Sequence, residues 1–175
     1  MTSQAKVKKA IRGNDKAFYE LIQEQQKKLY YTAFLYVKNE ESALDIVQET
    51  IFKAYKSIKN LKEPSYFSTW LYKILINTAL NFIKWSNRVV PMDDIEKYTE
   101  RIYLEQVPIE NKIDLMDALD CLPGHYKTVI ILRYYKDFTV KQISEVLDIP
   151  EGTIKTYLHR AIRQLKKELY IKENY

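Results

Sequence analysis

The sequence predicts an all-α protein of two small helical domains joined by an acidic linker, with a helix-turn-helix in the C-terminal domain. Its 175 residues include three glycines and five prolines, while Lys, Ile, Leu and Glu recur at helical spacing. Between Pro91 and Pro108 acidic residues outnumber basic ones, as is typical of a polar linker. We expect a helical domain over residues 1–88, a linker over 89–112 and a second helical domain over 113–175.

The composition excludes several classes of protein. The net charge is +5, from 28 basic and 23 acidic residues, so positive charge must be concentrated on one surface to matter for binding. Cys121 is the only cysteine, which excludes a disulfide framework and a cysteine cluster for zinc. The N-terminus has no apolar signal core, and no apolar run approaches the length of a membrane span. We expect a soluble cytoplasmic protein that needs no cofactor or metal.

Three helices are predicted in the N-terminal domain. Residues 1–11 are polar and are expected to fray. The segment Gly13–Asp15 carries a capping signal, and the apolar period of the first helix follows over residues 17–37. Ser42 is expected to cap the second helix, which runs to about residue 59.

The second helix has two distinct faces. Its predicted core face consists of apolar residues at helical spacing: Leu44, Val47, Ile51, Tyr55 and Ile58. A different stripe, spaced by four, three and four residues, consists of Asp45, Glu49, Phe52 and Lys56. Because Phe52 is a bulky aromatic residue among charges, it either packs under a neighbouring helix or anchors a partner protein.

A loop over residues 60–66, where Pro64 prevents a helix, precedes the third helix. This helix, over about 66–85, is predicted to bury Phe67, Leu71, Ile74, Thr78 and Phe82. One flank carries an aromatic ring, amides and lysines: Trp70, Lys73, Asn77, Asn81 and Lys84. Such a combination suits stacking on single-stranded nucleic acid and neutralising its phosphates, whereas the alternative makes Trp70 a core residue.

The C-terminal domain is predicted to contain a helix-turn-helix over Thr139–Arg163, after a helix that begins near Ile113 and another over 125–135. Pro150 cannot continue the first helix of the motif and can begin the second. The two helices are expected to share a core of Ile143, Leu147, Ile149 and Ile154.

The second helix of this motif is amphipathic. Its apolar face consists of Ile154, Leu158, Ala161 and Leu165. The opposite face consists of Lys155, Thr156, His159, Arg160, Arg163, Lys166 and Lys167. Glu151 is the only acid from residue 151 to 167, so this face suits the major groove and its phosphates. The alternative is an ordinary solvated amphipathic helix.

Four segments, in this order, resemble the bacterial RNA polymerase sigma factors of the extracytoplasmic-function (ECF) type, in the sigma-70 family. They are Gly13-x-Asp15-x-Ala17-Phe18-x-x-Leu21, Asp45-Ile-Val-Gln-Glu-Thr-Ile-Phe-Lys-Ala-Tyr55, Phe67-Ser-Thr-Trp-Leu-Tyr-Lys-Ile-Leu-Ile-Asn-Thr-Ala79, and a C-terminal set of Leu122-Pro123, Leu132-Arg133 and Gly152-Thr-Ile-Lys155. The resemblance covers nearly the whole chain and implies an alternative sigma factor, which binds RNA polymerase core and directs it to −35/−10 promoters.

The resemblance also implies a role for particular residues. The surface for the clamp helices of the largest polymerase subunit would be Asp45, Gln48, Glu49, Phe52 and Lys56. Reading and melting of the −10 element would involve Asn60, Leu61, Lys62, Ser65, Tyr66, Trp70, Lys73 and Asn77. The −35 element would contact Lys155, Thr156, His159, Arg160 and Arg163. Further implied partners are the polymerase flap and an anti-sigma factor, expected to be membrane-tethered, while the linker would run near the RNA exit path.

Two other functions are compatible with parts of the sequence. A stand-alone regulator that binds an operator as a dimer would also use the helix-turn-helix, and the Asp45–Tyr55 stripe and Trp70 would then be packing residues. A DNA recombinase needs several arginines around the scissile phosphate, but Arg12 is the only arginine before Arg88. We therefore expect a promoter-specificity subunit without catalysis of its own.

Overall fold

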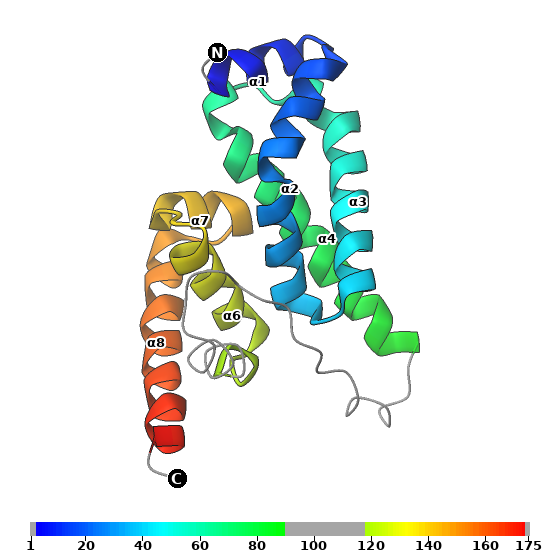
Figure 1. Ribbon diagram of the computed structural model, residues 1–175. Coiled ribbons are helices and arrows are strands. Elements are labelled where there is room, and N and C mark those ends of the chain that lie inside the picture. Colours follow the sequence, from blue (N-terminus) through cyan, green and yellow to red (C-terminus); the bar gives the residue numbers. More distant parts are fainter. Residues whose placement is uncertain (1–2, 90–117, 174–175) are drawn as a thin grey trace. The chain divides into compact units, whose positions relative to one another are not determined.

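The chain divides into two helical units, and each is described by itself (Figure 1). The computed structural model describes residues 3–89 and 118–173. The N-terminal unit contains α1 (Ser3–Ile11), α2 (Asp15–Val37), α3 (Glu40–Ser57), the 3₁₀ turns η1 (Ile58–Asn60) and η2 (Pro64–Tyr66), and α4 (Phe67–Val89). The C-terminal unit contains α6 (Gly124–Ile130), the π-helical turn η3 (Ile131–Tyr135), α7 (Val140–Leu147) and α8 (Glu151–Glu173). The prediction of an all-α protein with two helical units is confirmed, and the predicted linker after Val89 lies outside the described residues.

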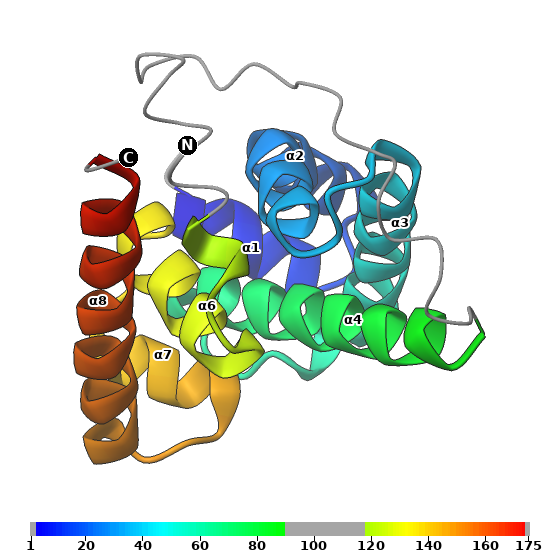
Figure 2. The same cartoon turned by 90° about the horizontal axis from the view of Figure 1, so that it is seen from below.

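The N-terminal unit is a bundle of α2, α3 and α4, with α1 across one end (Figures 1 and 2). Its centre is made of fully buried aliphatic side chains: Leu21, Leu29, Ile46, Leu71 and Leu75. Burying each such side chain contributes about 1.5–3 kcal/mol to folding. This packing fixes the rotation of α3 and α4 about their axes, and therefore decides which of their residues face outward.

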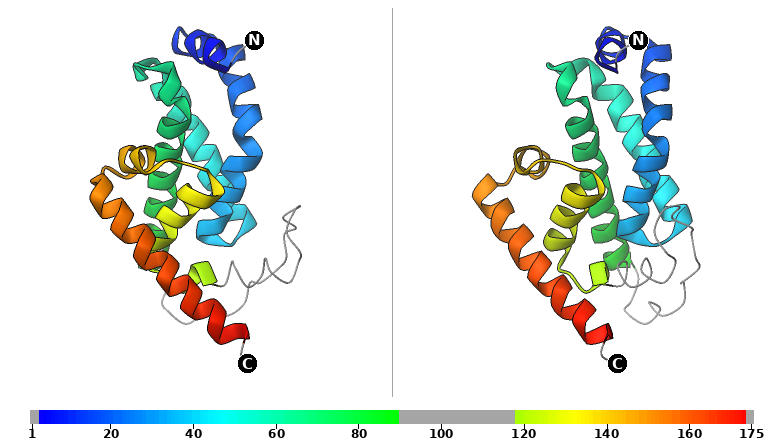
Figure 3. Two further views of the ribbon diagram at one scale, coloured as in Figure 1. Left: turned by 90° about the vertical axis from the view of Figure 1, so that its left-hand side faces the viewer. Right: turned by 60° about the vertical axis from the view of Figure 1, so that its left-hand side comes forward.

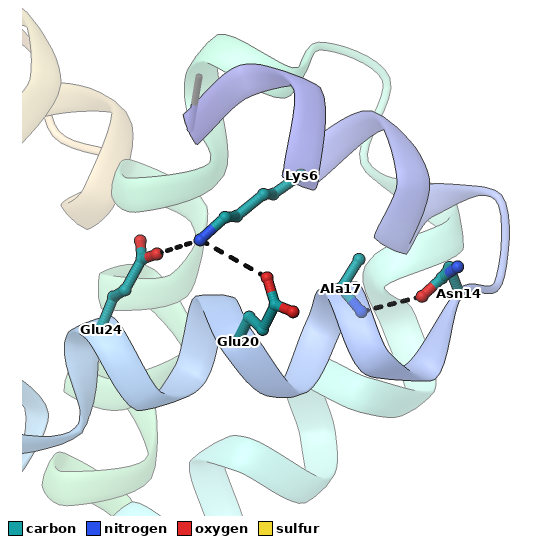
Figure 4. Close-up of polar contacts among 5 residues, drawn as sticks. All are labelled: Lys6, Asn14, Ala17, Glu20 and Glu24. Carbon is teal, nitrogen blue, oxygen red and sulfur yellow. Dashed lines mark hydrogen bonds and ion pairs between the residues drawn. The ribbon is translucent and has the colours of Figure 1, made fainter. Parts of the chain in front are cut away.

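Residues 3–11 form α1, so the prediction that this segment frays is wrong. Val7 and Ala10 are buried, with 2 % of each exposed. Lys6 of the same helix forms ion pairs with Glu20 and Glu24 of α2 (Figure 4). The buried apolar surface is too small to give a clear helical period in the sequence, and the contacts that stabilise α1 are tertiary.

Asparagine side chains cap the two helices that follow. Asn14 caps α2, and its Oδ1 accepts a hydrogen bond from the Ala17 backbone N–H at 2.9 Å (Figure 4). Asn39, rather than the predicted Ser42, caps α3, because its backbone is extended and its Oδ1 accepts from the Ser42 N–H at 2.8 Å. The cap thus lies three residues before the predicted position.

The face of α3 that packs into the bundle differs from the predicted one. Val47 and Ile58 are buried as predicted, but Leu44 and Tyr55 are 50 % and 49 % exposed, and Ile51 is half-buried. The buried residues of α3 are Ala43, Ile46, Val47, Thr50 and Ala54. Small side chains at a helix contact let the neighbouring helices approach closely, a preference that a pattern of bulky apolar residues does not reveal. The buried face of α3 is therefore rotated about the helix axis from the face that the sequence predicted.

The buried face of α4 is wider than predicted. Phe67, Leu71 and Thr78 are buried as predicted, whereas Ile74 and Phe82 are half-buried. Further buried residues are Thr69, Tyr72, Leu75, Ile76 and Ala79. The face is wide because α4 packs against both α2 and α3.

In the C-terminal unit, α7 and α8 form the predicted helix-turn-helix (Figure 3). Asp148 ends α7 in the left-handed conformation, with φ of 55°. The Ser144 hydroxyl donates to the Ile149 carbonyl at 2.6 Å, and the Pro150 carbonyl accepts from the Ile154 N–H at 3.1 Å. These bonds close the turn and begin α8, which extends beyond Arg163, the predicted end of the motif, to Glu173.

The predicted faces of the helix-turn-helix are largely present. The whole apolar face of α8 is buried: Ile154, Leu158, Ala161 and Leu165. Ile143 of α7 is buried with them, whereas Leu147 and Ile149 are half-buried. The spacing of apolar residues therefore predicted the orientation of α8 correctly.

Replacing Thr139 by alanine should destabilise the C-terminal unit by about 1 kcal/mol, because Thr139 begins α7 with a capping box. Its Oγ1 accepts from the Gln142 N–H at 3.2 Å, and its own N–H donates to Gln142 Oε1 at 2.9 Å. Calorimetry of the full chain measures the change. Thr156→Ala is the matched control, since that hydroxyl only donates to its own helix, to the Gly152 carbonyl at 3.0 Å. Equal losses in both variants would contradict a stabilising cap.

Candidate functional site

The outward face of α3 carries the five residues that the resemblance assigns to polymerase binding. Asp45, Gln48, Glu49, Phe52 and Lys56 are all exposed, and we call them the α3 stripe. The small buried residues on the opposite side of α3 fix the orientation of the stripe. The structure therefore brings all five residues together on one accessible surface.

Phe52 does not pack under a neighbouring helix, because 52 % of it is exposed. The Lys56 Nζ lies 4.1 Å from the centre of its ring, a cation–π contact worth about 0.5–1 kcal/mol at an exposed site. The neighbouring Glu49 carboxylate pairs with Lys53 at 3.2 Å, and both side chains are about half exposed. The explanation that Phe52 packs under a neighbouring helix is therefore wrong.

Contacts not foreseen from the sequence connect α3 to the rest of the bundle. The Lys53 Nζ lies 3.3 Å from the Thr78 Oγ1 on α4, within hydrogen-bonding distance. The Tyr55 hydroxyl donates to Asp15 Oδ1 at 3.0 Å, and its ring meets the Phe18 ring edge-on. The hydrogen bond to Asp15 and the charge of this carboxylate raise the pKa of Tyr55. These contacts join residues far apart in the sequence, so no local pattern could have indicated them.

Most of the side chains predicted to bind the −10 element, in the loop between α3 and α4 and on α4 itself, are exposed to solvent. The exposed residues of this set are Asn60, Lys62, Ser65, Tyr66 and Asn77. Leu61 is buried, with 8 % exposed, so its side chain anchors the loop and is not available for a DNA contact. Lys73 and Trp70 are half-buried, and the Trp70 ring lies 6.0 Å from the Phe67 ring. Trp70 thus packs on the bundle with one part and remains accessible with the other.

Trp85 is a large exposed side chain that was not among the predicted site residues. It lies near the end of α4 and is 63 % exposed. Trp85 follows Trp70 by 15 residues, so the two side chains point about 60° apart around the helix. Extending the count of helical positions from Trp70 to the end of α4 would have placed Trp85 near the same side of the helix.

The outward face of α8 presents every residue predicted for the −35 element. The exposed set is Lys155, Thr156, His159, Arg160, Arg163, Lys166 and Lys167. The Thr156 hydroxyl donates to the Gly152 carbonyl, so its oxygen remains available as an acceptor. Lys155 lies in the second turn of α8 and Arg160 in the third, and both side chains are exposed.

Aromatic rings hold α8 against α6. The His125 ring lies 4.3 Å from the Tyr126 ring and 4.9 Å from the Tyr157 ring of α8. Further along α8, the Gln164 side-chain amide donates to the Cys121 carbonyl at 3.0 Å. These contacts, together with the buried apolar face, hold the basic face of α8 in a fixed orientation.

Within residues 3–89 and 118–173, no group of three or more His, Cys, Asp or Glu side chains could hold a metal ion. None of the helices in the same ranges combines the length and the apolar character required to cross a membrane.

Known proteins are similar to this chain over nearly its whole length. It matches "Sigma-70 region 2" over residues 21–89 and "Sigma-70, region 4" over residues 112–165. It is 38 % identical over 153 residues to the RNA polymerase sigma factor SigV of Bacillus subtilis, covering 85 % of this chain and 88 % of that relative. It is 32 % identical over 182 residues to the ECF RNA polymerase sigma-E factor of Haemophilus influenzae, covering 97 % and 96 % of the two chains.

The chain belongs to the ECF sigma factors of the sigma-70 family. The fold of this sigma factor is similar to that of the sigma factor RpoE of Bartonella quintana, solved in complex with the anti-sigma factor NepR. The TM-score is 0.74 at 23 % identity, covering 89 % of this chain and 98 % of that one. The predicted family is therefore confirmed, and the protein is an alternative sigma factor, a promoter-specificity subunit for transcription initiation.

Proposed function

We propose that the α3 stripe of this sigma factor binds the clamp helices of the largest polymerase subunit. The observation that carries this proposal is the exposure of Phe52, because a half-exposed aromatic ring among charges is typical of an interface anchor. A stand-alone regulator would instead have used the stripe for packing, and all five of its residues are exposed. Asp45 and Glu49 add acidic groups beside the ring, which favour a basic partner surface.

We propose that residues 1–88 bind polymerase and the −10 element, and that residues 113–175 bind the −35 element and the polymerase flap. In the −10 surface, Tyr66 and the accessible part of Trp70 supply stacking surfaces, and Asn60 and Asn77 supply amide groups for base edges. In the −35 surface, the basic outer face of α8 enters the major groove. The acidic linker over 89–112 is proposed to occupy polymerase surface near the RNA exit path.

An anti-sigma factor is a further proposed partner. The RpoE structure of similar fold contains the anti-sigma factor NepR, which supports a regulator of this kind here. We propose that it is membrane-tethered, and that the sigma factor acts in the cytoplasm without catalysis of its own.

The test compares the protein alone with the protein on polymerase core. Alone, it should not shift a duplex promoter at physiological salt. With core, it should start transcription at a defined site downstream of one −35/−10 pair. A specific shift of duplex operator by the protein alone, with no effect of added core, would favour a dimeric regulator.

Arg160→Ala should relax sequence preference at one position of the −35 element, because arginine pairs bidentately with guanine and gives about 1–3 kcal/mol of discrimination. Lys155, also exposed on α8, is expected to be the other main contact with the −35 element. Lys166→Ala is the matched control: as a phosphate contact, it should weaken all promoters alike and reduce the salt dependence. The measurement is transcription by holoenzyme from a set of promoters with single −35 changes. A uniform loss in Arg160→Ala would contradict base reading by this residue.

A further inference from the structure

A pocket lies where the turn between α1 and α2 meets the end of α3. Its volume is about 210 Å³. Small-molecule sites typically have about 300–1,000 Å³, so this pocket suits a single side chain better than a small ligand. Its apolar lining consists of Ala10, Phe18 and Ile58, which are 2 %, 6 % and 3 % exposed. The pocket can therefore shield the aliphatic part of a side chain from water.

The polar lining of the pocket is predominantly positive. Lys56 and Lys59 both line it, and the Lys59 side chain lies across Gly13, where an added Cβ would be 3.6 Å from Lys59 Cε. Within the described residues, the Lys59 ammonium forms no hydrogen bond or ion pair. Asp15 is the one acid in the lining, and its Oδ1 already accepts from the Tyr55 hydroxyl at 3.0 Å. A carboxylate from outside the protein would therefore find an unpaired cation beside an apolar surface.

The pocket is continuous with the α3 stripe. Lys56 belongs to both, because its Nζ lies 4.1 Å from the centre of the Phe52 ring and its side chain lines the pocket. A partner that covers Phe52 therefore also reaches the edge of the pocket.

The charge along α3 and the segment that follows it changes sign. Residues 40–49 contain four acids and no base, whereas residues 50–62 contain four lysines and no acid. All eight charged side chains are exposed. Because complementary charges fix the register of an interface, a partner helix along α3 needs basic residues at one end and acidic residues at the other. Lys56 follows Asp45 by eleven residues, so about 16 Å, or three helical turns, separate the two ends.

We propose that the pocket receives an acidic side chain of the polymerase subunit that binds the α3 stripe. This inference rests on the proposed binding of the stripe to polymerase. The aliphatic part of a glutamate or aspartate covers Phe18 and Ile58, and its carboxylate pairs with the Lys59 ammonium. Since Asp45 and Glu49 face basic residues about three turns away, the contact fixes which end of the partner helix lies beside Lys59.

The first test measures the affinity of the full chain for polymerase core. Lys59→Glu should lower it about tenfold or more, because two carboxylates then meet. Lys59→Met keeps most of the side chain without its charge and should lower the affinity about three- to fivefold, the upper range for one exposed ion pair. Lys59→Arg should retain the affinity. Lys27→Glu is the matched control, since it makes the same charge change on an exposed residue of α2 outside the pocket and should leave the affinity nearly unchanged.

The second test identifies the side chain in the pocket. A carbodiimide joins an ammonium to a carboxylate only where the two groups are in contact. In the holoenzyme, Lys59 should form an amide with one glutamate or aspartate of the largest subunit, and mass spectrometry of the joined peptides locates that residue. Its replacement by lysine in the core should restore the affinity of Lys59→Glu.

Three results would overturn the proposal. They are unchanged affinity in both Lys59→Glu and Lys59→Met, an equal loss in Lys59→Glu and Lys27→Glu, or no crosslink from Lys59 to the largest subunit. The melting temperature of each variant should stay nearly unchanged, because Lys59 is exposed. Weaker core binding in Phe52→Ala with normal binding in both Lys59 variants would refute the pocket contact alone. Normal binding in Phe52→Ala would instead refute the proposed function of the α3 stripe.

Discussion

Replacing Phe52 by alanine should weaken binding to polymerase core by about 2 kcal/mol or more, which is about 30-fold in affinity. Phe52 lies among charged residues of the α3 stripe, half exposed and held by Lys56 over its ring. Binding would bury the ring fully, and alanine removes nearly all of that apolar area. Titration of core with labelled variants measures the change.

A stability measurement separates this role from a role in folding. Because half of the Phe52 side chain is already in solvent, its removal should leave the melting temperature nearly unchanged. Tyr19→Ala is the matched control, since Tyr19 is an exposed aromatic residue of α2 outside the stripe, with 63 % exposed. A large loss of stability with normal affinity for core would assign Phe52 to the fold instead.

Local patterns in the sequence predicted some elements well. Pro150 and the spacing of apolar residues were sufficient for the helix-turn-helix, because the helix of the basic face buries a continuous apolar stripe. Asp45, Glu49 and Lys56 of the α3 stripe are exposed, as charged residues at helical spacing generally are, but the pattern left open whether Phe52 packs under a neighbouring helix.

Other features depend on tertiary contacts that no local pattern contains. The core face of α3 was predicted from its bulky residues, yet Ala43, Thr50 and Ala54 are completely buried, where neighbouring helices approach closely. The ion pairs of Lys6 that hold α1 join it to α2. Leu61 lies in a polar loop, and only the fold shows that its side chain is buried.

Exchanging the loop between α3 and α4 for that of another ECF sigma factor should change the preferred −10 sequence and leave the −35 preference intact. A base can be read on its Watson–Crick edge only after it leaves the duplex, and its capture must offset a few kcal/mol of unstacking. The loop offers Asn60, Ser65 and Tyr66 for such a pocket, all exposed. The exchange should replace residues 60 and 62–66 but keep Leu61, because the buried leucine anchors the loop.

Asn77→Ala tests the same pocket without changing the loop. Asn77 is exposed on the third turn of α4, where its amide can pair with an extruded base. Its loss should impair open-complex formation by about 2 kcal/mol, within the range of one specific base contact, while binding to the closed duplex promoter stays nearly normal. Gln26→Ala, which removes an exposed amide from α2, should affect neither step. Permanganate footprinting of the melted segment measures opening, and competition with duplex promoter measures closed binding. If the exchanged loop leaves the −10 preference unchanged and Asn77→Ala opens promoters normally, base capture lies elsewhere and residues 60–66 are only a connection between helices.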